Sequence, residues 1–389
     1  MTESISALRR DVLSVMQSIR EYTRPLNPGR PDAAKTSELW EGNLNGQPTK
    51  RVIIYLRSSG CTWAVGRRRG VLRFHPGCLD CEHSVADTTY GVPISTKHYI
   101  GQFTAEYEKQ NFEDSPILCL YNEGNFFNEA ELPADARQEM LRIVGSDKRI
   151  KRLVLESLPE HISDRVLEDA RKLLGPVELE VGIGLESADP KVRALCVNKS
   201  YSLVMFKAVA QRVRRHCRLL AYVLVKPSFL TEKEALEDSI NAVKFAFATG
   251  VDAVSIEPVS LGKYTMSSVL NRVGLYRPTW LWTVLEVAKA GSVLGEVRIG
   301  GYQFAPSYAQ HARNCESCTP RIKQHIRHFN STYEFTDLLA ENCACISEWR
   351  EELGRKYPPL EERIASALAL LRGAQNPRGL VPITLDRTQ

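Results

Sequence analysis

The sequence predicts an α/β fold in which strands alternate with helices along the chain. Three observations carry this prediction: six short apolar runs recur at intervals, helix-like stretches separate them, and polar residues follow each run. At 389 residues the chain is long enough for one large domain with appended pieces. Six strand–helix units are too few to close a standard eight-stranded barrel, so an open partial barrel and a doubly wound sheet both satisfy the pattern.

The elements follow in order along the chain. The first 45 or so residues have an amphipathic helix pattern and then an arm that is broken by proline and glycine. The predicted strands cover 51–58, 116–122, 152–158, 177–187, 219–227 and 252–259. We therefore expect an N-terminal helical extension (1–48), a central strand–helix domain (49–296) and a C-terminal extension (297–389).

Composition restricts the class of protein. The first helix carries charges every few residues, unlike a signal peptide, and no run is long and apolar enough for a membrane span. Ten clustered cysteines in a long chain are typical of reduced, metal-binding thiols, so we expect a cytoplasmic protein. A net charge of +5 permits an anionic substrate but does not require nucleic acid.

Three cysteines, Cys61, Cys78 and Cys81, follow the first predicted strand. A [4Fe-4S] cluster has four irons, so three thiolates leave one iron open for a chelating substrate such as S-adenosylmethionine. The alternative is a zinc site in which Cys78 and Cys81 form one half and Cys61, with His75 or His83, completes the other. The three cysteines alone leave both interpretations open.

Two further stretches indicate a binding site for a nucleoside or an amino acid. The turn after the second strand offers backbone groups to a cluster-bound ligand, and glycines inside the fourth strand allow a close approach to its backbone. The candidates are Asn122, Glu123, Gly124, Asn125, Gly182, Gly184, Glu186 and Ser187. The simpler alternatives are an ordinary strand-to-helix turn and helix N-capping at Ser187 or Asp189.

The C-terminal extension contains Cys315, Cys318, Cys343 and Cys345, which form a CxxC and a CxC pair. Four thiolates saturate a metal, so we expect a structural zinc site, with an auxiliary iron–sulfur cluster as the alternative.

Two sets of residues stay without an assigned role. Four arginines lie between the first two cysteines: Arg67, Arg68, Arg69 and Arg73. One interpretation is that they contact an anionic or hydroxyl-rich substrate, and the other is that they form a solvated positive loop. The candidates for proton transfer are His75, Lys226, Glu123, Glu257 and Tyr302, and spacing singles out none of them as catalytic.

The stretches RSSGCTW, CLDCEH, YNEGNFFNEAELP, EVGIGLES and CESC with CACISEW occur in an order that resembles the radical S-adenosylmethionine superfamily. Within it, the chain is similar to the branch of the Elongator catalytic subunit and the archaeosine synthase radical subunit, over residues 51–350. The resemblance implies a partial (β/α)6 barrel, with a [4Fe-4S] cluster on Cys61, Cys78 and Cys81.

The same resemblance implies that S-adenosylmethionine binds against 122–125 and 182–187. Reductive cleavage then gives a 5′-deoxyadenosyl radical that abstracts a substrate hydrogen, and the electron comes from a donor such as flavodoxin or ferredoxin, with a reductase as a further partner.

The chain departs from that family in one place, because sixteen residues separate Cys61 from Cys78, which is longer than the family's usual interval. With no broad basic stripe in the sequence, we expect a small polar substrate rather than tRNA. The reaction expected is dehydration or deoxygenation of an aminosugar diol in antibiotic biosynthesis. The alternatives are a tRNA-modifying lyase of the archaeosine synthase type and a zinc-stapled RNA-binding module without enzyme activity.

Overall fold

The structure is a computed structural model that describes residues 3–21, 30–68, 71–82, 88–89, 91–301, 311–339 and 341–373. Of the candidates named above, Arg69, His83 and Tyr302 lie outside the described residues, as do the side chains of Arg67 and Arg68. The division at residues 48 and 296 stays a prediction.

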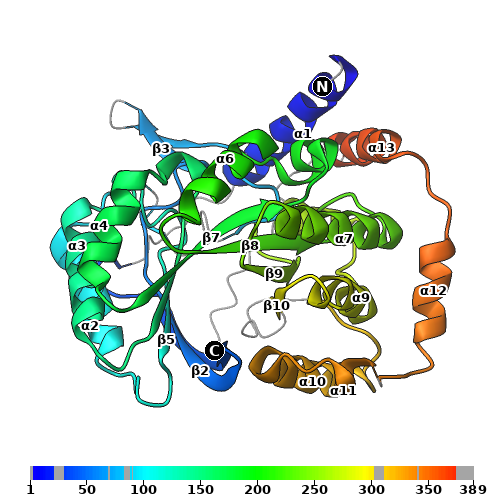
Figure 1. Cartoon of the computed structure of the whole chain (residues 1–389). Helices are drawn as coiled ribbons and strands as arrows, with labels where there is room; N and C mark the ends of the chain where they lie inside the picture. The colour runs from blue at the N-terminus through cyan, green and yellow to red at the C-terminus, as the bar shows by residue number, and fades with distance from the viewer. Residues whose placement is uncertain are drawn as a thin grey trace.

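The centre of the molecule is one curved sheet of eight strands (Figure 1). In spatial order these are β1 (Thr36–Leu44), β2 (Gln47–Tyr55), β5 (Ile117–Tyr121), β6 (Arg152–Glu156), β7 (Glu178–Glu186), β8 (Arg218–Val225), β9 (Ala253–Pro258) and β10 (Glu296–Ile299). Strand β1 pairs with β2 in antiparallel register, and all other pairs are parallel. The fold is therefore an α/β partial barrel, which confirms the open-barrel prediction.

The six predicted strands correspond to β2 and β5 to β9, and both edge strands were missed. Strand β1 carries polar residues such as Glu38, Glu41 and Asn43, so it lacks the apolar run of a buried strand. Strand β10 has only four residues, which is too short for a periodic signal. The sheet therefore has seven parallel strands and one antiparallel strand, in place of six parallel strands.

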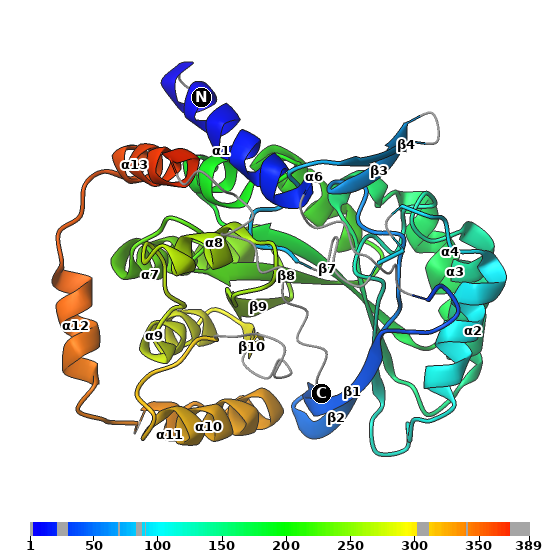
Figure 2. The ribbon, with the colours of Figure 1, turned by 180° about the vertical axis from the view of Figure 1, so that it is seen from behind.

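Helices cover the outer face of this sheet (Figures 1 and 2). They are α2 (Thr96–Tyr107), α3 (Ala134–Ser146), α4 (Asp164–Leu174), α6 (Leu203–Val213), α7 (Glu232–Ala248), α8 (Met266–Arg272) and α9 (Leu281–Ser292), with short turns η1 (Pro159–His161), α5 (Pro190–Val192) and η2 (Arg193–Val197). The extensions contribute α1 (Glu3–Glu21), α10 (Thr319–Thr332), α11 (Thr336–Leu339), α12 (Ile346–Gly354) and α13 (Leu360–Gly373). Among the described helices, none has the length and apolarity that crossing a membrane requires.

Helix α10 joins the two edges of the open sheet. The Asn330 side chain accepts from the Ile299 backbone N–H at 2.9 Å and donates to the Ile299 carbonyl at 2.7 Å, on edge strand β10. At the other edge, Asn43 of β1 donates to the carbonyl of Ser331 at 2.7 Å. Backbone groups of a sheet edge need such partners. The C-terminal extension therefore closes the seam of the barrel.

A small hairpin explains the long interval between the first two cysteines. Strands β3 (Val65–Arg68) and β4 (Val71–Phe74) pair with each other, with Val65 opposite Phe74, and the His75 N–H donates to the Ala64 carbonyl at 2.8 Å. The hairpin projects from the barrel and returns to its starting point (Figure 2). Its two ends are adjacent, so the added residues do not separate Cys61 from Cys78.

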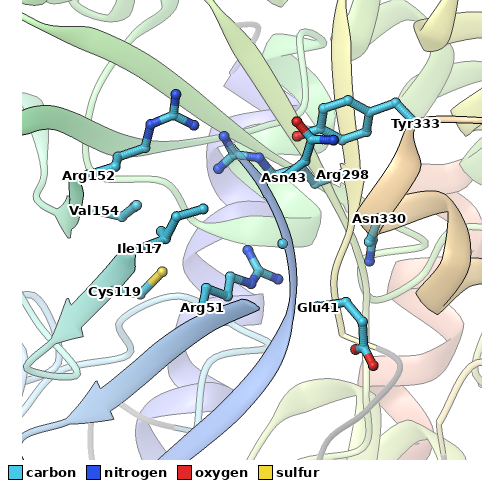
Figure 3. A pocket seen from close by; sticks show the side chains of 11 residues that line it. Glu41, Asn43, Arg51, Ile117, Cys119, Arg152, Val154, Arg298, Asn330 and Tyr333 are labelled. Carbon is cyan, nitrogen blue, oxygen red and sulfur yellow. The ribbon is translucent and has the colours of Figure 1, made fainter. Parts of the chain in front are cut away.

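The end of the barrel opposite the hairpin is filled by charged side chains. Glu180 is fully buried and accepts from Arg298 at 2.6 Å and from Arg218 at 3.1 Å, with Arg152 at 4.0 Å. Figure 3 shows Arg51, Arg152 and Arg298 around a small pocket at this level. Burial alone would raise the pKa of Glu180, but the arginines outweigh burial and lower the pKa to about 2.

We expect Glu180→Gln to lower the free energy of unfolding by about 3–5 kcal/mol, because it leaves buried guanidinium groups without their carboxylate. The pKa of Glu180 in the fold lies below its ordinary value of 4.5, so its contribution is complete above pH 4.5 and is lost as the pH falls towards 2. Urea unfolding between pH 7 and pH 3 measures both effects.

The matched control is Glu178→Gln. Its carboxylate also accepts from Arg152, at 2.6 Å, but the side chain is 40% exposed, so the loss should stay below about 1 kcal/mol. Equal losses from the two variants would contradict the role assigned to Glu180.

Candidate active site

A cavity of about 410 Å³ opens at the carboxyl ends of the parallel strands. This is the end of a parallel barrel where binding sites form, because the strand–helix loops meet there. Ten of the residues singled out in the sequence line it: Cys61, Cys78, Cys81, Glu123, Gly124, Asn125, Gly182, Gly184, Glu186 and Glu257. Segments from five different loops and strands are thus brought to one cavity.

The three cysteines are the only ones in the described part of the chain that line this cavity. Burial raises the pKa of the Cys78 thiol to about 12 and that of Cys61 well above its ordinary value. The thiols of Cys61 and Cys78 therefore stay protonated at neutral pH unless a metal displaces the protons. His75, the candidate fourth ligand of a zinc site, is exposed and does not line the cavity.

The loops that carry these cysteines are held by hydrogen bonds to residues that are distant in sequence. Asn198 has a left-handed backbone (φ 58°), and its side chain donates to the Gly77 carbonyl at 2.8 Å while its own carbonyl accepts from Trp63 at 3.1 Å. Asp80, between Cys78 and Cys81, accepts from the Ser228 N–H at 2.8 Å and hydroxyl at 2.6 Å. These contacts define the loop shape before any metal binds.

The buried Glu131 carboxylate joins the Cys61 loop to the turn after β5. It accepts from the Thr62 N–H at 2.8 Å and hydroxyl at 2.7 Å, and from the Asn125 N–H at 2.5 Å and side chain at 2.8 Å. Asn128 donates to it as well, at 2.9 Å. No local sequence pattern singles out Glu131, because its partners lie up to 69 residues away.

Strand β7 ends in a buried ion pair at the cavity. Glu186 has a left-handed backbone (φ 66°) at a register shift in the pairing with β8, and its carboxylate lies 2.7 Å from the Lys199 ammonium. Burial alone would lower the pKa of Lys199, but the Glu186 carboxylate outweighs burial and raises it. Lys199 lines the cavity although nothing in the sequence singled it out.

The glycines of β7 leave room that other side chains of the protein fill. A Cβ at Gly182 would lie 2.6 Å from the Tyr222 ring, and one at Gly184 would lie 2.6 Å from the Lys199 nitrogen. The side chains of Tyr222 and Lys199 occupy this space, so they explain the two glycines without a bound nucleoside.

Two predicted binding residues point elsewhere. Ser187 is buried outside the cavity lining and donates to Asp238 of α7 at 2.6 Å, and Asn122 is buried behind the lining. Within the described residues, the Asn122 side-chain nitrogen and the Ser157 hydroxyl have no hydrogen-bond partner. Buried polar atoms of this kind need a partner, and Ser157 lines the cavity, so a polar ligand fits there.

Of the proton-transfer candidates, Glu257 is best placed. It lies in the cavity and accepts from Ser255 at 2.6 Å, and burial raises its pKa to about 7. Glu123 also lines the cavity, but its carboxylate pairs with Lys35 at 2.5 Å. Lys226 lies outside the cavity lining, in a buried pair with Glu232 at 2.8 Å.

The four C-terminal cysteines form a second, separate cluster between the ends of α10 and α12. Their sulfur atoms all lie within 4.8 Å of one another, with Cys315 3.5 Å from Cys318 and from Cys343. One tetrahedral zinc ion with Zn–S bonds of about 2.3 Å holds its sulfurs about 3.8 Å apart. A four-iron cluster binds each thiolate to a different iron and so spreads them further. The spacing therefore fits a single ion.

Comparisons with known proteins find relatives that cover most of the chain. No family model matches the chain. It is 26% identical to archaeosine synthase subunit beta of Methanosarcina acetivorans over 351 residues, which cover 89% of this chain and 96% of that protein. It is 25% identical to the subunit of the same name from Thermococcus kodakarensis over 250 residues, or 64% of this chain and 74% of that protein.

Solved structures also match at low similarity. Methylornithine synthase matches with a TM-score of 0.46 and 10% identity, over 95% of this chain and 93% of that one. Elp3 of Methanocaldococcus infernus matches with a TM-score of 0.43 and 15% identity, over 64% of this chain and 60% of that one.

The partial barrel brings three cysteines to the cavity at its carboxyl end, which is the arrangement expected of the radical S-adenosylmethionine superfamily that the chain resembles. Within the superfamily it is similar to archaeosine synthase subunit beta.

We expect Glu131→Gln to lower the free energy of unfolding by about 2–3 kcal/mol, because the amide nitrogen would meet donors where an oxygen now accepts. Chemical denaturation of the metal-free protein measures this loss. Glu129→Gln is the control on the same loop; its side chain is 70% exposed and should change stability by less than about 1 kcal/mol. A Glu131 variant as stable as the control would show that the two loops are joined in another way.

Proposed function

We propose that Cys61, Cys78 and Cys81 hold a [4Fe-4S] cluster whose fourth iron binds S-adenosylmethionine. The observation that carries this proposal is the set of three half-buried thiols at one cavity, with no fourth cysteine in the described lining. When bound and reduced, these groups supply a 5′-deoxyadenosyl radical that takes a hydrogen atom from the substrate.

The chain's own residues have separate roles in this proposal. Lys199 offers a cation to the carboxylate of the bound S-adenosylmethionine, and Glu186 offers an acceptor to its ribose hydroxyls. Ser157, whose hydroxyl has no partner among the described residues, donates to a polar group of the ligand. Glu257, with a pKa of about 7, exchanges a proton with the substrate near neutral pH.

For the substrate, the similarity to archaeosine synthase subunit beta favours tRNA over the expected aminosugar. We propose that the chain modifies a nucleoside of tRNA. The β3–β4 hairpin supports this proposal, because its sequence contains Arg67, Arg68 and Arg73 and it projects beside the cysteine loops. Arginines of this kind contact phosphate groups. No comparison supports antibiotic biosynthesis or a dehydratase.

The test is anaerobic. The purified chain is reconstituted with iron and sulfide, reduced in the presence of S-adenosylmethionine, and assayed for 5′-deoxyadenosine by mass spectrometry, with either total tRNA or an aminosugar added. We expect about four irons at the first site and stimulation by tRNA. Cys81→Ala should lose these irons and the product, whereas Cys217→Ala, away from both clusters, should keep them.

The substrate proposal has its own variant. Replacing Arg67, Arg68 and Arg69 together by Ser should weaken tRNA binding and flatten its salt dependence without changing iron content. Stimulation by the aminosugar alone would restore the small-molecule interpretation. A preparation that holds zinc only and forms no 5′-deoxyadenosine would instead favour an RNA-binding module.

We also propose that Cys315, Cys318, Cys343 and Cys345 bind a structural zinc ion. The supporting observation is the sulfur spacing of 3.5–3.6 Å between neighbouring pairs. The site lies where α10 begins, because Cys318 is the residue that caps this helix. Zinc there would fix the helix that joins the two sheet edges.

We therefore expect Cys343→Ser to lose one zinc per chain and to lower the melting temperature, because structural zinc contributes directly to folding free energy. Metal analysis and thermal unfolding measure the two effects. The electronic spectrum of the iron cluster should not change. Four additional irons in the wild-type protein, lost in this variant, would identify an auxiliary cluster instead.

A further inference from the structure

The N-terminal helix reaches the loop of the second and third cysteines through one fully buried arginine. Arg20 donates to the carbonyl oxygens of Pro76 at 3.2 Å, of Cys78 at 2.9 Å and of Cys81 at 2.7 Å. The fork of the guanidinium group suits several acceptors at once, unlike a lysine ammonium. One side chain therefore determines the path of the backbone on both sides of the CxxC turn.

The helix holds this arginine rigidly. Val12 and Met16 are buried at four-residue steps before Arg20, so the guanidinium continues the apolar stripe of α1. The helix packs along α13, and its end lies against the base of the β3–β4 hairpin (Figure 2). Arg9 of the same helix donates to Asn198 at 2.8 Å, the residue that bonds Gly77 of this loop.

Burying a guanidinium is costly, so its position needs a compensating interaction. The carbonyl oxygens of Pro76, Cys78 and Cys81 supply part of this compensation by accepting from the guanidinium. A cluster held by three thiolates gains negative charge on reduction. A fixed cation nearby favours the reduced form and raises the reduction potential.

We propose that Arg20 is a positioning residue for the iron–sulfur cluster, which sets the shape of the Cys78–Cys81 loop and supplies a positive charge that makes the cluster easier to reduce. The inference rests on the proposed cluster at Cys61, Cys78 and Cys81. The redox step is the addition of one electron from an external donor to the cluster, with no bond made or broken in the protein.

The test compares Arg20→Gln, which removes the charge and keeps a donor, with Arg20→Lys, which keeps the charge and loses the fork. Both are reconstituted in the full chain, and the midpoint potential is measured by redox titration of the reduced cluster's paramagnetic resonance signal. The rate of iron loss to a chelator is the second readout. Gln17→Met is the control, because Gln17 lies one turn earlier and donates to the Phe74 carbonyl at 2.8 Å.

We expect Arg20→Gln to shift the midpoint potential to more negative values, and Arg20→Lys to keep it near the wild-type value. Both variants should lose iron faster than the wild type, and Gln17→Met should change neither readout. An unchanged potential in Arg20→Gln, or wild-type iron loss in Arg20→Lys, would overturn the proposal; if Arg20→Gln does not fold, the iron loss of Arg20→Lys decides. A wild-type chain that binds no iron at this site would instead overturn the proposed function.

Discussion

The contact between Asn330 and the backbone of Ile299 is the constraint on which the barrel depends. A sheet of eight strands leaves two edges with unpaired backbone groups, and here the amide of one helix satisfies the N–H and the carbonyl of the last strand. The same helix contacts the first strand through Ser331 and Asn43. The barrel is therefore completed by a segment outside the strand–helix repeat, and the four-cysteine cluster lies where that segment begins.

The two ends of the barrel use charge in opposite ways. At the end opposite the hairpin, the charge of Glu180 is balanced by Arg152, Arg218 and Arg298, so these buried groups need no ligand. At the open end, the cavity retains protonated thiols, a Ser157 hydroxyl without a described partner and a Glu257 with a pKa of about 7. Buried polar groups of this kind reduce stability unless a ligand compensates them, and they accumulate at functional sites.

The sequence predicted those parts of the fold that depend on local pattern. Strands β2 and β5 to β9 were found because both of their faces are buried and their apolar runs are continuous. The cysteines were found because thiols cluster in sequence. Glu131 contacts Thr62, 69 residues away, and Lys199 contacts Glu186, 13 residues away, so local spacing indicates neither. One feature of the sequence indicates that Arg20 is buried: it follows Val12 and Met16 at four-residue steps on the apolar face of its helix.

The β3–β4 hairpin shows that a long interval in sequence between two cysteines need not place them far apart in space. The chain leaves the barrel at Ala64 and returns at His75, and these two residues are hydrogen-bonded to each other. Cys61 and Cys78 can therefore share one site whatever the hairpin carries. Because the hairpin is anchored at its base and projects from the barrel, changes in its sequence need not alter the positions of Cys61 and Cys78.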